Sequence, residues 1–239
     1  MSAFSDTAAY MRSQHAAGNV PAYEEHLKAA YRKFVKPNDF CVDVGVHKGE
    51  HFRELRSLGA TVMGFEPCPD FADDIPNVHR YALSSQAAVD RVFYQNRQYA
   101  GASGLLPTLG VEYVTTYGVP VTTLDMALGV IHPRLVYLKI DVEGHELDVL
   151  QGGINTIRAD EPIISVEFSM ATAGLHGREA GDLWKWCEWN GYTIHDLWGN
   201  PCGSYSEWMS VVDQSYWDYL LVPNSRFLSG GQVGQTFRW

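Results

Sequence analysis

Residues 40–49, with the sequence FCVDVGVHKG, decide the fold of this chain. They lead from a short, mostly apolar segment into a glycine turn, which is typical of a buried strand that opens into a helix. The same order of strand and helix then repeats along the chain. We expect strands over 40–44, 61–66 and 78–83 and helices over 51–58 and 70–75. Because strands alternate with helices at this spacing, the sequence predicts βαβ crossovers and an α/β fold with a mostly parallel sheet.

The sequence on either side of this region extends the sheet and places helices before it. Apolar residues at helical spacing, with Pro21 in the first turn, predict the second of two N-terminal helices over 21–35. Further strands are expected over 91–95, 119–122, 135–141, 162–168, 192–196 and 216–222, and helices over 146–158, with an interruption at Gly152 and Gly153, and over 179–190. No linker divides the chain. We therefore expect a single domain over 1–239, with a helical extension over 1–36, a core over 37–170 and a C-terminal part over 171–239.

The composition argues against several classes of protein. Of 239 residues, 46% are hydrophobic and 19% are charged, as in a globular chain. The 18 Lys and Arg against 28 Asp and Glu give a net charge of −10, which disfavours a nucleic-acid partner. There is no apolar run of the roughly 20 residues that a membrane span needs, and no secretory signal over 1–15. We therefore expect a cytoplasmic protein without a membrane or nucleic-acid partner. The tryptophans near the C-terminus suit a core or the interface of a homo-oligomer.

The glycine turn and a carboxylate that follows it form the first candidate site. Gly45 and Gly49 let a ligand approach the backbone at the start of a helix, where N–H groups are free. The acid before them, Asp43, suits an amino group better than a pyrophosphate, and the spacing is not the GxGxxG dinucleotide fingerprint. Glu66 ends the next strand about 20 residues later, where a carboxylate accepts hydrogen bonds from a ribose. Together these residues favour a nucleoside ligand over a purely structural turn and a solvated carboxylate.

The second candidate site is the segment KIDVEGHE over 139–146. Lys139 and Asp141 share one face of a strongly apolar strand, and Asp141 stands at its carboxyl end, where α/β sheets place ligands. Five ionisable groups in eight residues are costly to bury without a function. The structural alternative is an ion-pair cluster in which Glu143 and Glu146 favour the N-terminus of a helix. We place function ahead of that alternative.

Several short motifs of this chain together resemble the FkbM-type S-adenosylmethionine-dependent methyltransferases. The resemblance covers about residues 39–170, and its specific part is KIDVEGHE. The motifs are DVG at 43–45, FEP at 65–67, LD at 124–125, KIDVEGHE at 139–146, VLQGG at 149–153, VE at 166–167 and LVP at 221–223. One departure is that Val46 and His47 stand where the family usually has Ala and Asn.

The resemblance implies a class I (Rossmann-like) methyltransferase sheet with helices on both faces, in which the core over 37–170 binds S-adenosylmethionine. It implies that Asp43, Gly45 and Gly49 line the methionine end of this cofactor and that Glu66 holds its ribose. Ala82 and Leu83 would flank the adenine. His47, Ser103 and Asp141 complete the expected cofactor contacts, although a solvent loop explains Ser103 equally well.

The resemblance also implies methyl transfer to oxygen on a small molecule or a glycan. We expect the acceptor to be a hydroxyl of a saccharide or a glycosylated metabolite. His145 is the first candidate base, since a histidine titrates near neutral pH, with Asp141, Glu143 and Lys139 as further catalytic candidates. Alternatively, Asp141, Glu143 and Glu167 hold Mg²⁺ or Mn²⁺, which prefer oxygen ligands.

Two other functions compete with methyl transfer. An NAD-dependent oxidoreductase would use the same kind of sheet, but the chain lacks the GxGxxG fingerprint. A non-catalytic module that binds a nucleoside or a glycan would need no charged cluster at the end of a buried strand.

Overall fold

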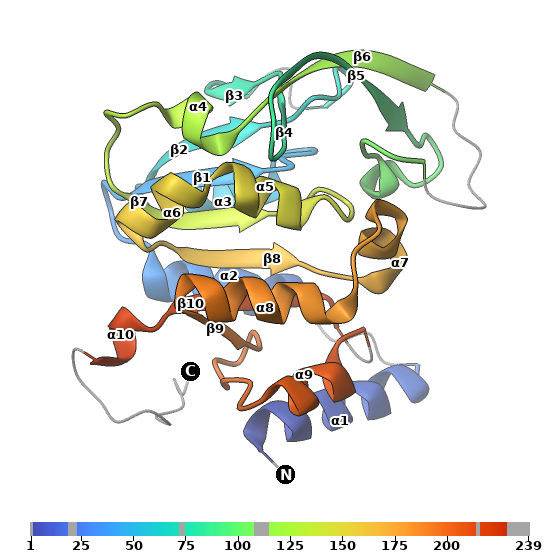
Figure 1. Ribbon diagram of the computed structural model, residues 1–239, viewed down its shortest axis with the longest axis vertical. Coiled ribbons are helices and arrows are strands. Elements are labelled where there is room, and N and C mark those ends of the chain that lie inside the picture. Colours follow the sequence, from blue (N-terminus) through green and yellow to red (C-terminus); the bar gives the residue numbers. More distant parts are fainter. Residues whose placement is uncertain (1, 19–22, 72–74, 108–114, 214–215, 229–239) are drawn as a thin grey trace.

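The computed structural model describes residues 2–18, 23–71, 75–107, 115–213 and 216–228. A seven-stranded sheet crosses the middle of the molecule in the order β3-β2-β1-β7-β8-β10-β9 (Figure 1). Its strands are β1 (Phe40–Val44), β2 (Thr61–Phe65), β3 (Val78–His79), β7 (Leu135–Ile140), β8 (Ile163–Glu167), β9 (Tyr192–His195) and β10 (Asp218–Pro223). Neighbouring strands are parallel except at β10, which is antiparallel to both β8 and β9. The predicted α/β fold with a mostly parallel sheet is confirmed.

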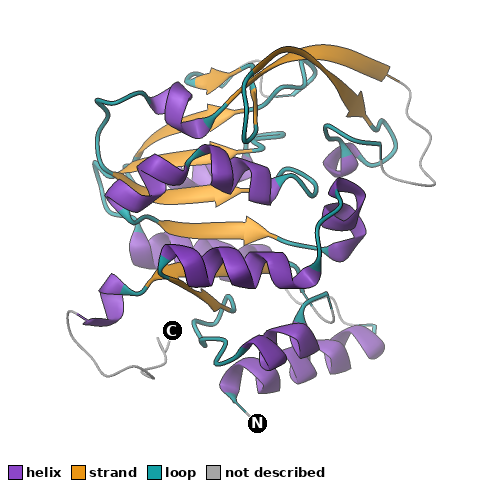
Figure 2. Ribbon diagram, viewed as in Figure 1, coloured by secondary structure: helices purple, strands orange, loops and turns teal. Residues whose placement is uncertain are grey.

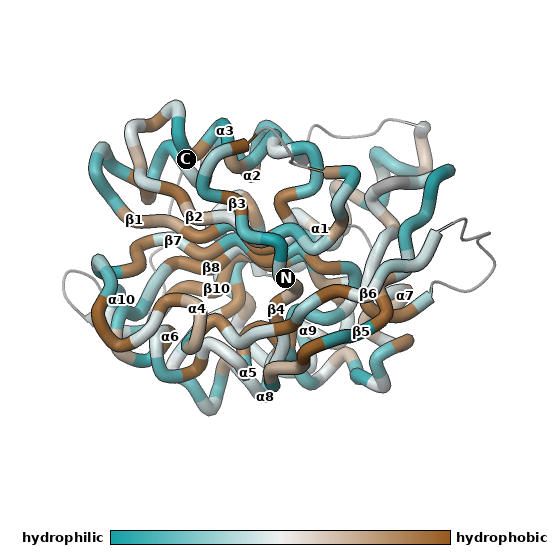
Figure 3. Tube along the Cα trace, turned by 90° about the horizontal axis from the view of Figure 1, so that it is seen from above, coloured by the Kyte–Doolittle hydropathy of each residue, from teal (hydrophilic) through white to brown (hydrophobic). Residues whose placement is uncertain are grey.

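Helices cover both faces of this sheet (Figure 2). On one face lie α4, α5, α6 and α8, and on the other lie α2 and α3, while α1 packs against α9 beside the β9 edge (Figure 1). The helices are α1 (Ala3–Ala16), α2 (Tyr23–Phe34), α3 (Glu50–Ser57), α4 (Leu124–Leu128), α5 (Glu146–Gly152), α6 (Ile154–Asp160), α7 (Met170–Ala173), α8 (Ala180–Asn190), α9 (Tyr205–Val211) and α10 (Ser225–Leu228). Because both faces are covered, every residue of β1 is buried, and the strands form the hydrophobic middle layer in Figure 3.

A second, three-stranded sheet extends from one end of the molecule in the order β4-β6-β5, with β4 (Ala82–Leu83), β5 (Ala88–Gln95) and β6 (Thr115–Thr122). The strands expected over 91–95 and 119–122 are therefore parts of two longer strands. Pro120 lies inside β6 opposite a register shift in β5, where Val121 pairs with Ala88 and Val119 with Arg91. Because proline has no N–H to donate, the partner strand bulges at this point.

The prediction of one continuous strand over 78–83 was wrong, because the structure has two short strands there. Val78 and His79 pair with β2 in the large sheet, whereas Ala82 and Leu83 pair with β6 in the small one. Between them, Arg80 donates hydrogen bonds to the carbonyls of Phe71 and Cys68, the second at 2.7 Å, which ties the chain to the loop after β2. These side-chain bonds hold the chain at the point where it passes from the large sheet to the small one.

Other predicted boundaries agree with the structure. The interruption predicted at Gly152 and Gly153 separates α5 from α6. Pro21 and residues 72–74 of the helix predicted over 70–75 lie outside the described residues. The described part of that prediction is not helical, because Asp70 lies in a turn, Phe71 in a bend and Ile75 in an irregular segment. Among the described residues, no helix is both long and apolar enough to cross a membrane.

Candidate active site

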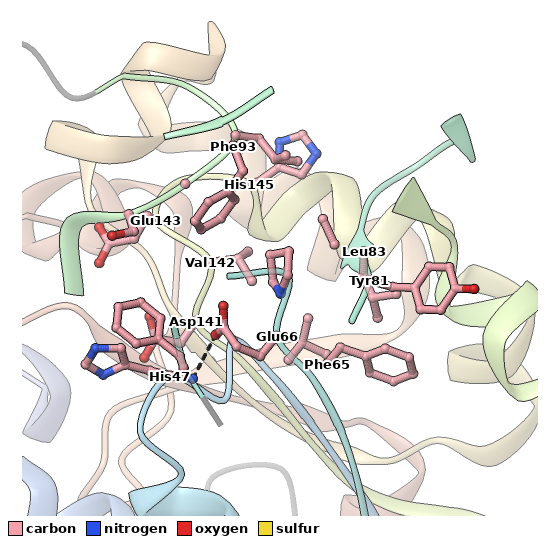
Figure 4. Close-up of a pocket in the computed structure, with 18 of the residues that line it drawn as sticks. His47, Phe65, Glu66, Tyr81, Leu83, Phe93, Asp141, Val142, Glu143 and His145 are labelled. Carbon is pink, nitrogen blue, oxygen red and sulfur yellow. Dashed lines mark hydrogen bonds between the residues drawn. The ribbon is translucent and has the colours of Figure 1, made fainter. Parts of the chain in front are cut away.

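A cavity of about 280 Å³ opens where the carboxyl ends of β1, β2, β7 and β8 meet the small sheet (Figure 4). Such an end is where open α/β sheets bind ligands. The structure brings ten of the predicted site residues to its walls: Gly45, His47, Glu66, Ala82, Leu83, Ser103, Asp141, Glu143, His145 and Glu167. They come from segments that are far apart in the chain, so the cavity is a product of the tertiary fold.

The glycine turn fits tightly under the end of β7. Gly45 has a φ of +84°, and a Cβ there would lie 1.8 Å from the carbonyl oxygen of Asp141. The N–H of Asp141 donates to the carbonyl of Val44 at 3.0 Å. A residue with a side chain at position 45 would therefore force the ends of β1 and β7 apart.

Glu66 connects the turn to the next strand. One of its carboxylate oxygens accepts the N–H of His47 at 2.8 Å, and the other accepts the N–H of Cys68 at 2.9 Å. Burial raises the pKa of Glu66, while these two N–H groups act in the opposite direction. A carboxylate has about four lone-pair positions, so both oxygens keep capacity for hydroxyl groups of a ligand. This arrangement fits the predicted contact with a ribose.

The opposite wall is apolar and comes largely from the small sheet. Ala82 and Leu83 of β4 lie beside Phe93 of β5 and Leu105, all of them buried. Phe71 adds a ring that packs edge-on against His47, with 4.5 Å between centroids. Such a slot suits a flat aromatic base. The sequence analysis missed Phe71, Phe93 and Leu105 as cavity residues, because no short motif marks an apolar residue as the wall of a distant site.

Three carboxyl groups stand at the remaining end of the cavity. Asp141, Glu143 and Glu167 each bring one oxygen within 4.8 Å of the others. Burial raises the pKa of Asp141, but the Lys139 ammonium 3.0 Å away and a hydrogen bond with Glu167 together lower it more, so this carboxyl stays ionised. The pKa of Glu143 is raised by burial and then by Asp141, and that of Glu167 is raised by Asp141 and then by burial. Their oxygens fit either a shared proton or a hard divalent cation.

Asp43, Gly49 and Lys139 lie behind the wall of the cavity. Asp43 is fully buried, its oxygens have no hydrogen-bond partner among the described residues, and the Lys139 Nζ is 3.7 Å from one of them. Burial raises the pKa of Asp43 to about 7, against the opposing effect of Lys139. Gly49 begins α3 with a φ of +81°. The cation that this buried carboxylate meets in the structure is Lys139, and the contact of Asp43 with the methionine end of a cofactor stays a prediction.

His145 lines the cavity but has both ring nitrogens engaged. Its Nε2 is 2.8 Å from the Ser84 hydroxyl, and its Nδ1 is 3.0 Å from Nδ1 of His176. Burial lowers its pKa, which keeps the ring neutral. The role of His145 as a base stays a prediction, and its position supports a different role that is developed below.

The family model for the methyltransferase FkbM domain matches residues 43–194 of this chain. The chain belongs to the FkbM family of S-adenosylmethionine-dependent methyltransferases. The matched region spans β1 to β9 and contains all the residues that line the cavity. No curated protein matches the chain.

Two solved methyltransferase structures align with this FkbM chain over most of its length. The crystal structure of methyltransferase FkbM from Methylobacillus flagellatus aligns over 93% of this chain with a TM-score of 0.52 and 14% identity, and the chain spans 55% of that protein's length. A TehB-like SAM-dependent methyltransferase from Corynebacterium glutamicum aligns over 91% of this chain and 96% of its own, with 15% identity and a TM-score of 0.44. The alignment with the FkbM methyltransferase supports the predicted class I methyltransferase sheet.

Proposed function

We propose that this chain transfers a methyl group from S-adenosylmethionine to a hydroxyl group of a saccharide or a glycosylated metabolite. The observation that carries the proposal is the division of one cavity into two ends. Glu66, the glycine turn and the apolar slot offer a nucleoside hydrogen-bond acceptors and an apolar surface for its base. Asp141, Glu143 and Glu167 offer a hydroxyl group carboxyl oxygens that accept its hydrogen bond. Carboxyl groups accept hydrogen bonds from several hydroxyls at once, which suits a polyhydroxylated acceptor.

The carboxyl cluster supplies the proton acceptor in this proposal. Glu143 lies within reach of Asp141 and Glu167, and its raised pKa makes it a stronger base than an exposed carboxylate. As the acceptor oxygen bonds to the methyl carbon, the carbon–sulfur bond breaks with its electron pair on sulfur, and the hydroxyl proton passes to Glu143. Lys139 keeps Asp141 ionised beside it.

A divalent metal is the alternative use of the same cluster. Asp141, Glu143 and Glu167 would hold Mg²⁺ or Mn²⁺, and the metal would lower the pKa of the acceptor hydroxyl. Dialysis against EDTA distinguishes the two uses. We expect activity to survive dialysis and to collapse in Glu143→Gln; loss on dialysis with recovery on adding Mg²⁺ would assign the cluster to a metal.

The test of the whole function has two stages. Titration calorimetry should show binding of S-adenosylmethionine and S-adenosylhomocysteine and no binding of NAD. A screen of saccharide and glycoside acceptors should then give a product heavier by one CH₂ unit, with the methyl on oxygen. Binding without any methylated product would favour the non-catalytic module. A methyl group on nitrogen or carbon would overturn the assignment to a hydroxyl.

A further inference from the structure

His145 stands between the adenine side of the cavity and a segment that follows β8. It caps the start of α5 and is 5% exposed. Its Nε2 bonds to the hydroxyl of Ser84. Ser84 directly follows Leu83, which lines the apolar slot near His145 (Figure 4). The Nδ1 of His145 bonds to Nδ1 of His176, at the end of the short 3₁₀ helix η2 (Gly174–His176).

A second connection runs beside the first. The hydroxyl of Ser85 donates to Asp148 at 3.0 Å, and Asp148 accepts from the guanidinium of Arg178 at 2.6 Å. Ser84–His145–His176 and Ser85–Asp148–Arg178 are therefore two parallel bridges. Each starts in the strand end after β4, crosses the first turn of α5 and ends in the segment 176–178. Both bridges fix the same strand end, and this strand end carries one wall of the apolar slot.

The nitrogens of His145 are fully used in this arrangement. Between two facing Nδ1 atoms one must carry the proton and the other must accept it, and Nε2 makes the complementary bond to Ser84. No lone pair is left to take a proton from a methyl acceptor. The acidic cluster has carboxyl oxygens that can take this proton, and its member Glu143 touches the bridge through its backbone, which bonds to His176.

We propose that His145 and His176 are positioning residues that hold the adenine wall of the cofactor site through Ser84. The inference rests on the proposed function, because it takes the apolar slot to be the adenine site. It assigns the histidine of the KIDVEGHE motif to cofactor affinity rather than to proton transfer. Breaking the bridge should loosen Leu83 and Ser84 and weaken binding of the adenosine half of the cofactor.

Two substitutions of His176 separate the hydrogen bond from simple packing. The amide of Asn reaches about the position of the imidazole Nδ1 and can donate or accept there, whereas Leu fills similar space without a polar atom. His132→Leu, at the opposite end of the sheet, is the matched control. Affinities for S-adenosylhomocysteine and for adenosine alone are measured by titration calorimetry, with the melting temperature of each variant.

We expect His176→Leu to weaken both ligands by about tenfold, as loss of one buried hydrogen bond predicts. His176→Asn should restore affinity to within about threefold of the natural protein, and the control should bind normally. The inference is overturned if His176→Leu binds both ligands as tightly as the natural protein does. It is also overturned if His176→Leu and His176→Asn lose the same affinity. If His176→Leu does not fold, Ser84→Ala removes one hydroxyl from the same bridge and must weaken adenosine likewise. A natural protein that binds neither ligand overturns the proposed function, and the inference with it.

Discussion

At the scale of single residues, Glu66 holds two turns together and faces the cavity with the same carboxylate. It accepts the N–H of His47 in the glycine turn and the N–H of Cys68 in the loop after β2. Asp43 is the contrasting case, because its buried oxygens have no hydrogen-bond partner among the described residues and the nearest cation is 3.7 Å away. Backbone N–H groups therefore compensate for the burial of Glu66, whereas the Lys139 ammonium is the partner of the buried Asp43.

We expect Glu66→Gln to weaken S-adenosylhomocysteine binding about tenfold or more. A Gln amide has one oxygen, so it cannot accept both backbone N–H groups and a ribose hydroxyl as the carboxylate does, and hydrogen bonds to charged groups contribute about 1.5–3 kcal/mol. Calorimetry on the folded variant measures the loss. Unchanged affinity would remove Glu66 from the ribose site.

Asp43→Asn should stabilise the ligand-free protein at pH 8 while reducing cofactor affinity. The folded pKa of Asp43 is raised to about 7 from its ordinary 3.8, mainly by burial. The folded protein therefore favours protonated Asp43. This preference adds to the free energy of unfolding fully below the ordinary pKa of 3.8, and it is lost as the pH rises through about 7. The variant should gain on the natural protein by about 4 kcal/mol between pH 4 and pH 8. Denaturant unfolding at both pH values tests this, and an equal difference at both would contradict the assigned pKa.

At the scale of elements, the turn between β7 and α5 sets the geometry of the site. Gly144 has a φ of +97°, and a Cβ there would meet the carbonyl group of Thr172 in α7 at 2.4 Å. Glu146 secures the same turn by accepting the N–H groups of Val142 and Gly144. The turn thus fixes Glu143 against the segment that follows β8.

Gly144→Ala should lower the free energy of unfolding by about 2–4 kcal/mol, since it adds a backbone clash to an unfavourable φ. Gly177→Ala is the matched control, because Gly177 also has a positive φ, +70°, but nothing within 4 Å of its Cβ position. The control should cost only about 1–2 kcal/mol. Urea unfolding of both variants gives the comparison, and equal losses would show that the contact with Thr172 yields easily.

At the scale of the whole molecule, the cavity depends on two sheets that share no strand. The large sheet supplies Glu66 and the carboxyl cluster, and the small sheet supplies Leu83 and Phe93. A ligand that spans both ends must therefore stabilise the two sheets together.

S-adenosylhomocysteine at about 100 times its dissociation constant should raise the unfolding free energy by about 2.7 kcal/mol. For a chain of this length we expect the melting temperature to rise by about 5–10 °C, and NAD should not change it. Hydrogen exchange should slow both in β1 and in β4 and β5. Protection confined to the large sheet would place the adenine outside the apolar slot.

The sequence alone determined the α/β fold, the succession of the main strands along the chain and half of the residues that line the cavity. Local signals sufficed there, because a buried parallel strand, a glycine turn and a terminal acid each leave a short pattern. The tertiary structure alone decided that residues 78–83 serve two sheets, since Arg80 bonds to a loop that precedes it by several residues. It also decided that Phe71, Phe93 and Leu105 line the cavity and that His145 pairs with His176. These contacts join segments distant in the chain, and no spacing within one segment encodes which distant side chain will meet it.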